Sequence, residues 1–259
     1  KKVEKPARYT GGEWGQTIKD KKDIDIRFAF CFPDTYEIGM SNLGIRILYD
    51  VLNARADTWC ERVYAPWTDM EKYMREYDIP LFALESGDPL REFDFIGFTL
   101  QYELCYTNML NMLSLAGVPI RSADRDEGMP IVVCGGPCTY NAEPMADFID
   151  LCLIGEGEEE IELMTIYAKH KKKGFVKEDF LHECAKQEGF YVPSFYSVEY
   201  NDDGTVKKYT PKYDDIPTKI KKRIIKDMDT VRFPKKVVMP FIDTVHDRIM
   251  LEVYRGCIR

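Results

Sequence analysis

Short apolar runs alternate with amphipathic stretches through the first two thirds of this chain. Residues 26–32 are almost continuously apolar, which is typical of a strand buried on both faces of a sheet. Pro33 ends this strand because it has no N–H to donate, and residues 43–52 then carry apolar side chains at helical spacing. The same pattern predicts four more strands, at residues 61–66, 93–100, 131–134 and 148–154.

The regular alternation of strands and helices over residues 25–173 predicts a doubly wound α/β domain, with helices on both faces of a five-stranded parallel sheet. Beyond this domain the pattern changes. A helix is predicted at residues 175–188, and a β-hairpin follows with its turn at residues 201–204. We therefore expect residues 174–245 to form a small α+β extension that also serves as a linker.

The two ends of the chain differ from the predicted domain. Residues 1–24 are polar and rich in lysine, which predicts an extended N-terminal arm. Residues 246–259 contain a strand-like apolar run that stops just after Gly256 and Cys257. Because a strand needs a neighbour to pair with, we expect the chain to be a fragment of a longer protein.

Composition limits the classes of partner. The chain has 259 residues and a formal net charge of −8, which argues against a nucleic-acid-binding face. Its apolar runs are too short for a membrane span, so no membrane partner is predicted either. Most of the eight cysteines lie inside apolar or helical stretches, which favours buried thiols in a reduced, cytoplasmic compartment.

Four loops follow predicted strands and should meet at one edge of the sheet, where ligands of such domains bind. Two of them are polar and two are rich in glycine, a residue that lets the backbone approach a ligand closely. Together they predict a cleft. The candidate binding residues in these loops are Asp34, Tyr36, Gly39, Ser41, Thr99, Leu100, Gln101, Gly135, Gly136, Pro137, Gly155, Glu156 and Gly157.

The order of these loops resembles a known family. Gly135-Gly136-Pro137, followed about twenty residues later by a Gly-Glu-Gly-Glu loop at 155–158, resembles the cobalamin-binding domain found upstream of radical S-adenosylmethionine (SAM) domains. That domain has an Asp-x-His-x-x-Gly pattern, which Asp34 and Gly39 match with Tyr36 at the histidine position. The terminal run 252–257 resembles the approach to the first cysteine of the radical SAM trio Cys-x-x-x-Cys-x-x-Cys. The resemblance therefore implies that residues 246–259 are the first strand of a truncated radical SAM domain.

This resemblance implies an N-terminal, cobalamin-binding-like accessory domain of a radical SAM iron–sulfur enzyme. The longer protein would hold a 4Fe–4S cluster, with Cys257 as one ligand, and S-adenosylmethionine. The present chain alone would not be catalytic, and its partner would be the remainder of its own chain. A neutral phenol is a poor cobalt ligand, so cobalamin is expected to bind without histidine ligation and without a bond from Tyr36 to the metal.

Two other functions remain open. The domain could be a non-catalytic scaffold, capping a substrate or contacting another protein, that has lost corrinoid binding. It could also be a flavodoxin-like domain for a flavin or nucleotide, since the same sheet edge can hold either ligand. A zinc site at Cys134 and Cys138 is not expected, because no second pair of ligands lies near them in the sequence.

Overall fold

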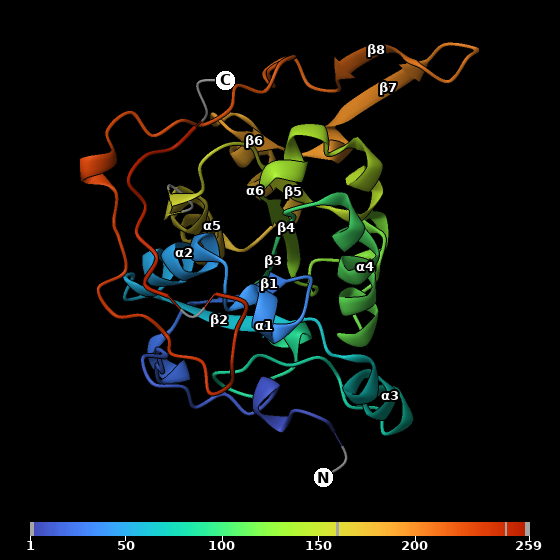
Figure 1. Ribbon diagram of the computed structural model, residues 1–259. Coiled ribbons are helices and arrows are strands. Elements are labelled where there is room, and N and C mark those ends of the chain that lie inside the picture. The colour runs from blue at the N-terminus through green and yellow to red at the C-terminus, as the bar shows by residue number, and fades with distance from the viewer. Residues whose placement is uncertain (1–2, 159–160, 247, 257–259) are drawn as a thin grey trace.

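The computed structural model describes residues 3–158, 161–246 and 248–256 of the chain. At its centre is a six-stranded sheet in the order β2-β1-β3-β4-β5-β6 (Figure 1). The first five strands run parallel and β6 runs antiparallel to β5. The strands are β1 (Ile26–Phe32), β2 (Thr58–Tyr64), β3 (Phe95–Thr99), β4 (Ile131–Gly135), β5 (Leu151–Leu153) and β6 (Phe190–Tyr191).

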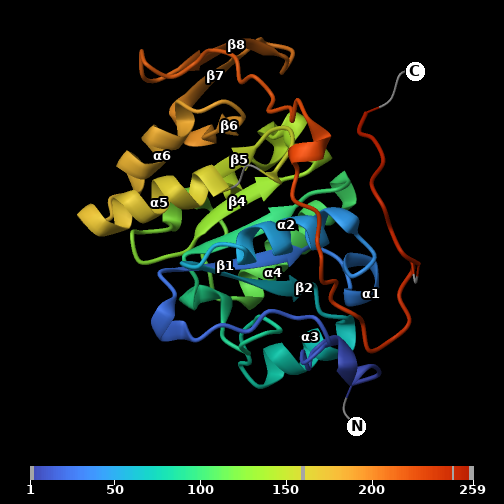
Figure 2. The same ribbon diagram turned by 90° about the vertical axis from the view of Figure 1, so that its left-hand side faces the viewer.

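Helices lie on both sides of this sheet, with α2 and α5 on one side and α4 on the other (Figures 1 and 2). The α2 helix begins where Asn42 accepts a hydrogen bond from the Ile45 amide, and it buries its apolar side chains against β1 and β2. The helices are α1 (Tyr36–Gly39), α2 (Leu43–Asn53), α3 (Thr68–Glu76), α4 (Tyr106–Leu115), α5 (Ile161–Lys173) and α6 (Lys177–Ala185).

The mixed α/β fold with a mostly parallel sheet confirms the prediction, but the predicted count of five strands is wrong. The sixth strand, β6, pairs Tyr191 with Cys152 and Phe190 with Leu153. With only two residues it is too short to show a periodic pattern, so its pairing depends on tertiary contacts. The first polar loop also contains a short helix, α1, where continuous loop was expected.

The predicted hairpin is present as β7 (Tyr196–Tyr200) and β8 (Val206–Pro211), which pair antiparallel and extend from the body of the domain (Figure 1). The base of the hairpin is attached through aromatic side chains. The ring of Tyr196 stacks on Tyr209 with 4.8 Å between their centroids, and Tyr209 also hydrogen-bonds Tyr191 of β6.

The N-terminal arm is attached to the domain through a buried ion-pair network. In β2, the Arg62 guanidinium lies 3.0 Å from a Glu13 carboxylate oxygen and 2.6 Å from one of Glu85. The Tyr36 hydroxyl donates a further hydrogen bond to Glu13, at 2.9 Å. Because Glu13 and Arg62 are each 2% exposed, their attraction is little screened by water, so this contact holds the arm in place.

The C-terminal segment, defined here as residues 231–246 and 248–256, passes along the outside of α2 (Figure 2). Arg232 lies 2.5 Å from Asp50 near the end of α2, and the His246 amide donates to Ser41 Oγ just before its start. Between these points the Met239 amide donates to the Trp14 carbonyl of the arm, at 2.9 Å. Residues 248–256 form no strand or helix, and Cys257 lies outside the described residues.

Six of the seven cysteines in the described ranges are buried and Cys138 is half-buried, which confirms the prediction of buried thiols. Burial raises the pKa of Cys31 and Cys184 well above the usual value for a thiol, so both are held as neutral side chains. None of the helices in these ranges has the length and apolar character needed to cross a membrane.

We predict that Arg62→Met will lower the free energy of unfolding by about 3–5 kcal/mol, because it leaves the carboxylates of Glu13 and Glu85 buried without their counter-ion. The control is Arg121→Met, which removes an ion pair with Asp147 whose two side chains are 60% and 70% exposed. That change should cost less than about 1 kcal/mol. Urea unfolding followed by circular dichroism measures both, and equal losses would contradict a dominant role for the buried network.

Candidate functional site

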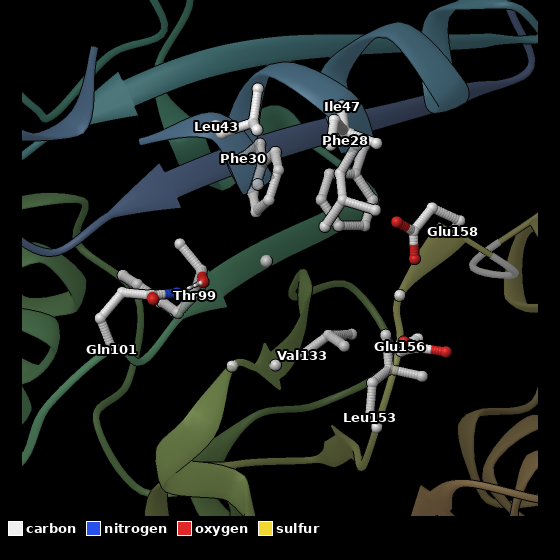
Figure 3. Close-up of a pocket in the computed structure, with 18 of the residues that line it drawn as sticks. Phe28, Phe30, Leu43, Ile47, Thr99, Gln101, Val133, Leu153, Glu156 and Glu158 are labelled. Carbon is white, nitrogen blue, oxygen red and sulfur yellow. Dashed lines mark hydrogen bonds between the residues drawn. The ribbon is translucent and has the colours of Figure 1, made fainter. Parts of the chain in front are cut away.

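A cavity of about 260 Å³ lies toward the carboxyl ends of β1, β3, β4 and β5, on the side of the sheet covered by α2 (Figure 3). Its walls are mainly apolar. Phe28 and Phe30 come from β1, and Leu43 and Ile47 come from α2. On the opposite wall, two further apolar side chains come from β4 and β5, namely Val133 and Leu153.

Glycines shape the cavity in two different ways. A Cβ atom at Gly135 would meet no atom within 4 Å, so the missing side chain there is itself part of the open space. At Gly136, φ is +96° and a Cβ would lie 2.7 Å from the Leu100 carbonyl oxygen. At Gly155, φ is +111° and a Cβ would lie 2.2 Å from the Arg223 carbonyl oxygen. These two positions need glycine for backbone packing.

Polar groups gather at the two ends of the cavity. At one end, Gln101 Nε2 donates to Thr99 Oγ1 at 2.5 Å. The other end is formed by a loop of residues 155–158, here called the mouth loop, which carries Glu156 and Glu158 (Figure 3). Arg255 of the C-terminal segment also lines this end, and a hydrogen bond to Glu252 contributes to raising the pKa of its guanidinium.

The structure brings part of the predicted site together. Seven predicted residues line the cavity, namely Thr99, Gln101, Gly135, Gly136, Gly155, Glu156 and Gly157. The other six predicted residues do not line it. They are Asp34, Tyr36, Gly39, Ser41, Leu100 and Pro137. The second, third and fourth loops therefore meet at the cavity, whereas the first loop contributes only through the start of α2 that follows it.

Side chains of the first loop have other partners. Tyr36 is 1% exposed and packs edge-to-face on Tyr64, with 5.3 Å between ring centroids. Burial and the neighbouring Glu13 carboxylate raise its pKa strongly, so the phenol stays neutral. Asp34 accepts a hydrogen bond from Tyr102, and burial together with that bond raises the pKa of Tyr102 to about 12. Ser41 donates to the Glu37 carbonyl at 2.7 Å.

A comparison with protein families adds the decisive observation. The family described as radical SAM proteins, N-terminal, matches residues 44–193, more than half of the chain. The chain belongs to this family. The match runs from α2 past β6, so it includes all of the glycines that line the cavity and leaves out the first loop.

One relative of this radical SAM N-terminal domain is the uncharacterized protein MJ0966 of Methanocaldococcus jannaschii. The two sequences are 27% identical over 188 residues, which cover 64% of this chain and 36% of the relative. The chain therefore spans about a third of the length of this curated relative.

Sequence reasoning missed the apolar half of the site in this radical SAM N-terminal domain. The apolar pattern assigns Phe28 and Phe30 to a strand buried on both faces and indicates no role for them at a ligand site. Gly97 was a usable signal, because a glycine inside an apolar strand often marks close packing. A Cβ at this position would lie 2.3 Å from the Phe28 ring. Glu252 and Arg255 also line the cavity, but they lie in a segment without helix or strand, so no periodic pattern predicts their position at the site.

Metal ligands do not converge in the part of the chain that the structure describes. No group of three or more His, Cys, Asp or Glu side chains is arranged there to hold a metal ion. His170 lies 2.8 Å from Glu183, and His182 lies 3.1 Å from Asp215. The predicted iron–sulfur ligand, Cys257, is outside the described residues.

We predict opposite effects for two neighbouring glycines. Gly135→Ala should keep or raise stability, by up to about 1 kcal/mol, because the methyl group enters open space and reduces the freedom of the unfolded chain. Gly136→Ala should cost about 1–3 kcal/mol, because alanine is strained at φ +96° and ψ 176° and its methyl group would meet the Leu100 carbonyl. Thermal unfolding of the two variants tests this; the same sign for both would contradict our account of the loop.

Proposed function

We propose that this radical SAM N-terminal domain binds a corrinoid at the carboxyl edge of its sheet and presents it to the remainder of its own chain. The observation that carries the proposal is the open space facing Gly135, in a cavity that spans β1, β3, β4 and β5. The strand order β2-β1-β3-β4-β5 is that of flavodoxin-like sheets. In such sheets the strand order reverses between β1 and β3, and ligands bind there.

The size of the cavity favours one part of a corrinoid. Its volume of about 260 Å³ is slightly below the range of about 300–1,000 Å³ for small-molecule pockets. It therefore suits a single planar ring system, such as the benzimidazole base on the nucleotide tail of cobalamin. Phe28 and Phe30 offer aromatic surface to such a base, and the Thr99 hydroxyl offers a hydrogen bond.

The corrin ring itself would stay outside the cavity, over the loops at the sheet edge. Gly136, Gly155 and Gly157 line the cavity next to these loops, and Gly157 in the mouth loop would allow the backbone to approach a large flat ring there. Tyr36 would not bind cobalt, because it is a neutral, buried phenol whose hydroxyl is held by Glu13. A bound corrinoid would supply the organocobalt chemistry, while the residues of this domain hold the cofactor and shield one face of it from water.

The charge at the cavity disfavours FMN more than cobalamin, because FMN ends in a phosphate monoester with about two negative charges, whereas the nucleotide tail of cobalamin contains a phosphodiester with only one. Among the described residues that line it, Arg255 is the only basic one, and three carboxylates surround its guanidinium. A phosphate would meet net negative charge at this end. The scaffold alternative has support of its own, because Tyr36 occupies the predicted histidine position and packs into the core.

Catalysis would then belong to the longer protein. A 4Fe–4S cluster with Cys257 as one ligand, and S-adenosylmethionine, would lie in the part of the protein that follows this domain. We propose accordingly that the present chain has no catalytic turnover of its own. Turnover detected in an activity assay of the chain alone would contradict this proposal.

The test is an absorbance spectrum of the domain after incubation with micromolar hydroxocobalamin or FMN and removal of free ligand by desalting. We expect the wild-type chain to retain the corrinoid and not FMN. Gly135→Leu should lower the affinity at least tenfold, because its side chain would fill the space that the planar base needs. Gly128→Leu is the matched control, since Gly128 does not line the cavity and its nearest neighbour is the Asp126 carboxylate.

Three results would redirect the proposal. Retention of neither ligand by the wild-type chain would favour the scaffold function. Retention of FMN alone would favour a flavin site. Equal retention of the corrinoid by Gly135→Leu and the wild type would place the cofactor somewhere other than this cavity. Thermal unfolding of each variant establishes that a lost affinity reflects the cavity and not a lost fold.

A further inference from the structure

The C-terminal segment supplies the outer wall of the cavity. Glu252 and Arg255 both line it, together with the mouth loop. The Arg255 guanidinium lies 2.7 Å from a Glu252 oxygen and 3.5 Å from a Glu156 oxygen, and it also pairs with Glu158. Two parts of the chain that are about a hundred residues apart in sequence therefore meet through one side chain.

The two sides of this contact are held very differently. The mouth loop is anchored to the domain, because the Glu156 amide donates to the Arg223 carbonyl and the Arg223 amide donates to the Ile154 carbonyl. Residues 249–254 carry apolar side chains that face water, with Ile249 91% and Val253 86% exposed. Since little apolar surface is buried there, the Arg255 contacts are a large part of what fixes this stretch.

The contact also occupies one end of the cavity. A corrin ring over the mouth loop would occupy the place where Arg255 meets Glu156 and Glu158. The side chains of Arg255, Glu156 and Glu158 are 18%, 24% and 12% exposed, so the ion pairs leave little room at this end. A large ring could therefore bind over these loops only if Arg255 lost its contacts with Glu156 and Glu158.

We propose that Arg255 is a latch, which fastens the C-terminal segment across the cavity mouth and is released when a ligand occupies the loops. This inference rests on the proposed function, and it adds a coupling between the site and the chain that follows. Release of Arg255 would free the end of the described segment, so occupancy of the cavity would be coupled to the position of residues 249–256. By thermodynamic reciprocity, docking of the following chain would change the affinity for the ligand by the same factor.

The first arm of the test needs no ligand. Backbone order parameters from NMR relaxation should be near 0.85 for residues 249–256 in the wild type, and below about 0.6 in Arg255→Met, which keeps the aliphatic stem and loses the guanidinium. Glu158→Gln should change them in the same direction. Arg248→Met is the matched control, because it makes the same change in the same segment at a residue that does not line the cavity.

The second arm uses hydroxocobalamin. In the wild type, saturating ligand should lower the order parameters of residues 249–256 to the level of ligand-free Arg255→Met. Arg255→Met should bind the ligand at least about fivefold more tightly, which is the lower end of the usual range for coupled sites. Arg248→Met should behave like the wild type.

Two results would overturn the latch. One is an unchanged order parameter in Arg255→Met; the other is an equal loss of order in Arg248→Met. If the wild-type chain bound no hydroxocobalamin, the proposed function would fail, while the ligand-free order parameters would still decide whether Arg255 fastens the segment. Ligand binding that left residues 249–256 as ordered as before would overturn the coupling and leave corrinoid binding intact.

Discussion

The arrangement of this domain depends on a guanidinium buried between two carboxylates. An unpaired charge inside a protein is very unfavourable, so Arg62 requires Glu13 and Glu85 to be in place at the same time. Glu13 belongs to the N-terminal arm, which in turn supports the C-terminal segment through the contact between Trp14 and Met239. The C-terminal segment that reaches the cavity mouth is thus connected, by successive contacts, to the two buried ion pairs of Arg62 in β2.

The cavity depends on absent side chains as much as on present ones. Gly97 lets the Phe28 ring lie against β3, and Gly135 leaves space beyond it. Larger residues at these two positions would fill the space between α2 and the sheet with ordinary core packing. Ligands of parallel sheets bind at the carboxyl edge, but that edge needs a cavity to hold one. In this domain Gly97 and Gly135, in the adjacent strands β3 and β4, leave the space for that cavity.

The sequence predicted the five parallel strands, the hairpin and the three loops that meet at the cavity, because periodicity and glycine spacing are local signals. It predicted neither β6 nor the partners of Tyr36. The two residues of β6 carry no period, and the hydroxyl of Tyr36 binds a carboxylate 23 residues upstream, in an arm whose path no local pattern describes. The loop at 155–158 was predicted, but its contact with the C-terminal segment was missed for a similar reason, since Arg255 reaches Glu158 across 97 residues of chain.

The short antiparallel strand β6 has a consequence for how this domain can be recognised. It covers the outer edge of β5, while at the opposite edge the Arg62 carbonyl accepts from the Leu84 amide and the Arg62 amide donates to Glu85. Partners that extend a sheet need an edge with free backbone groups. At these positions the backbone groups are already paired, which disfavours strand addition at the two edges of the central sheet. The β7–β8 hairpin is different, because among the described residues its two strands pair only with each other, so its outer edges are where a further strand could add.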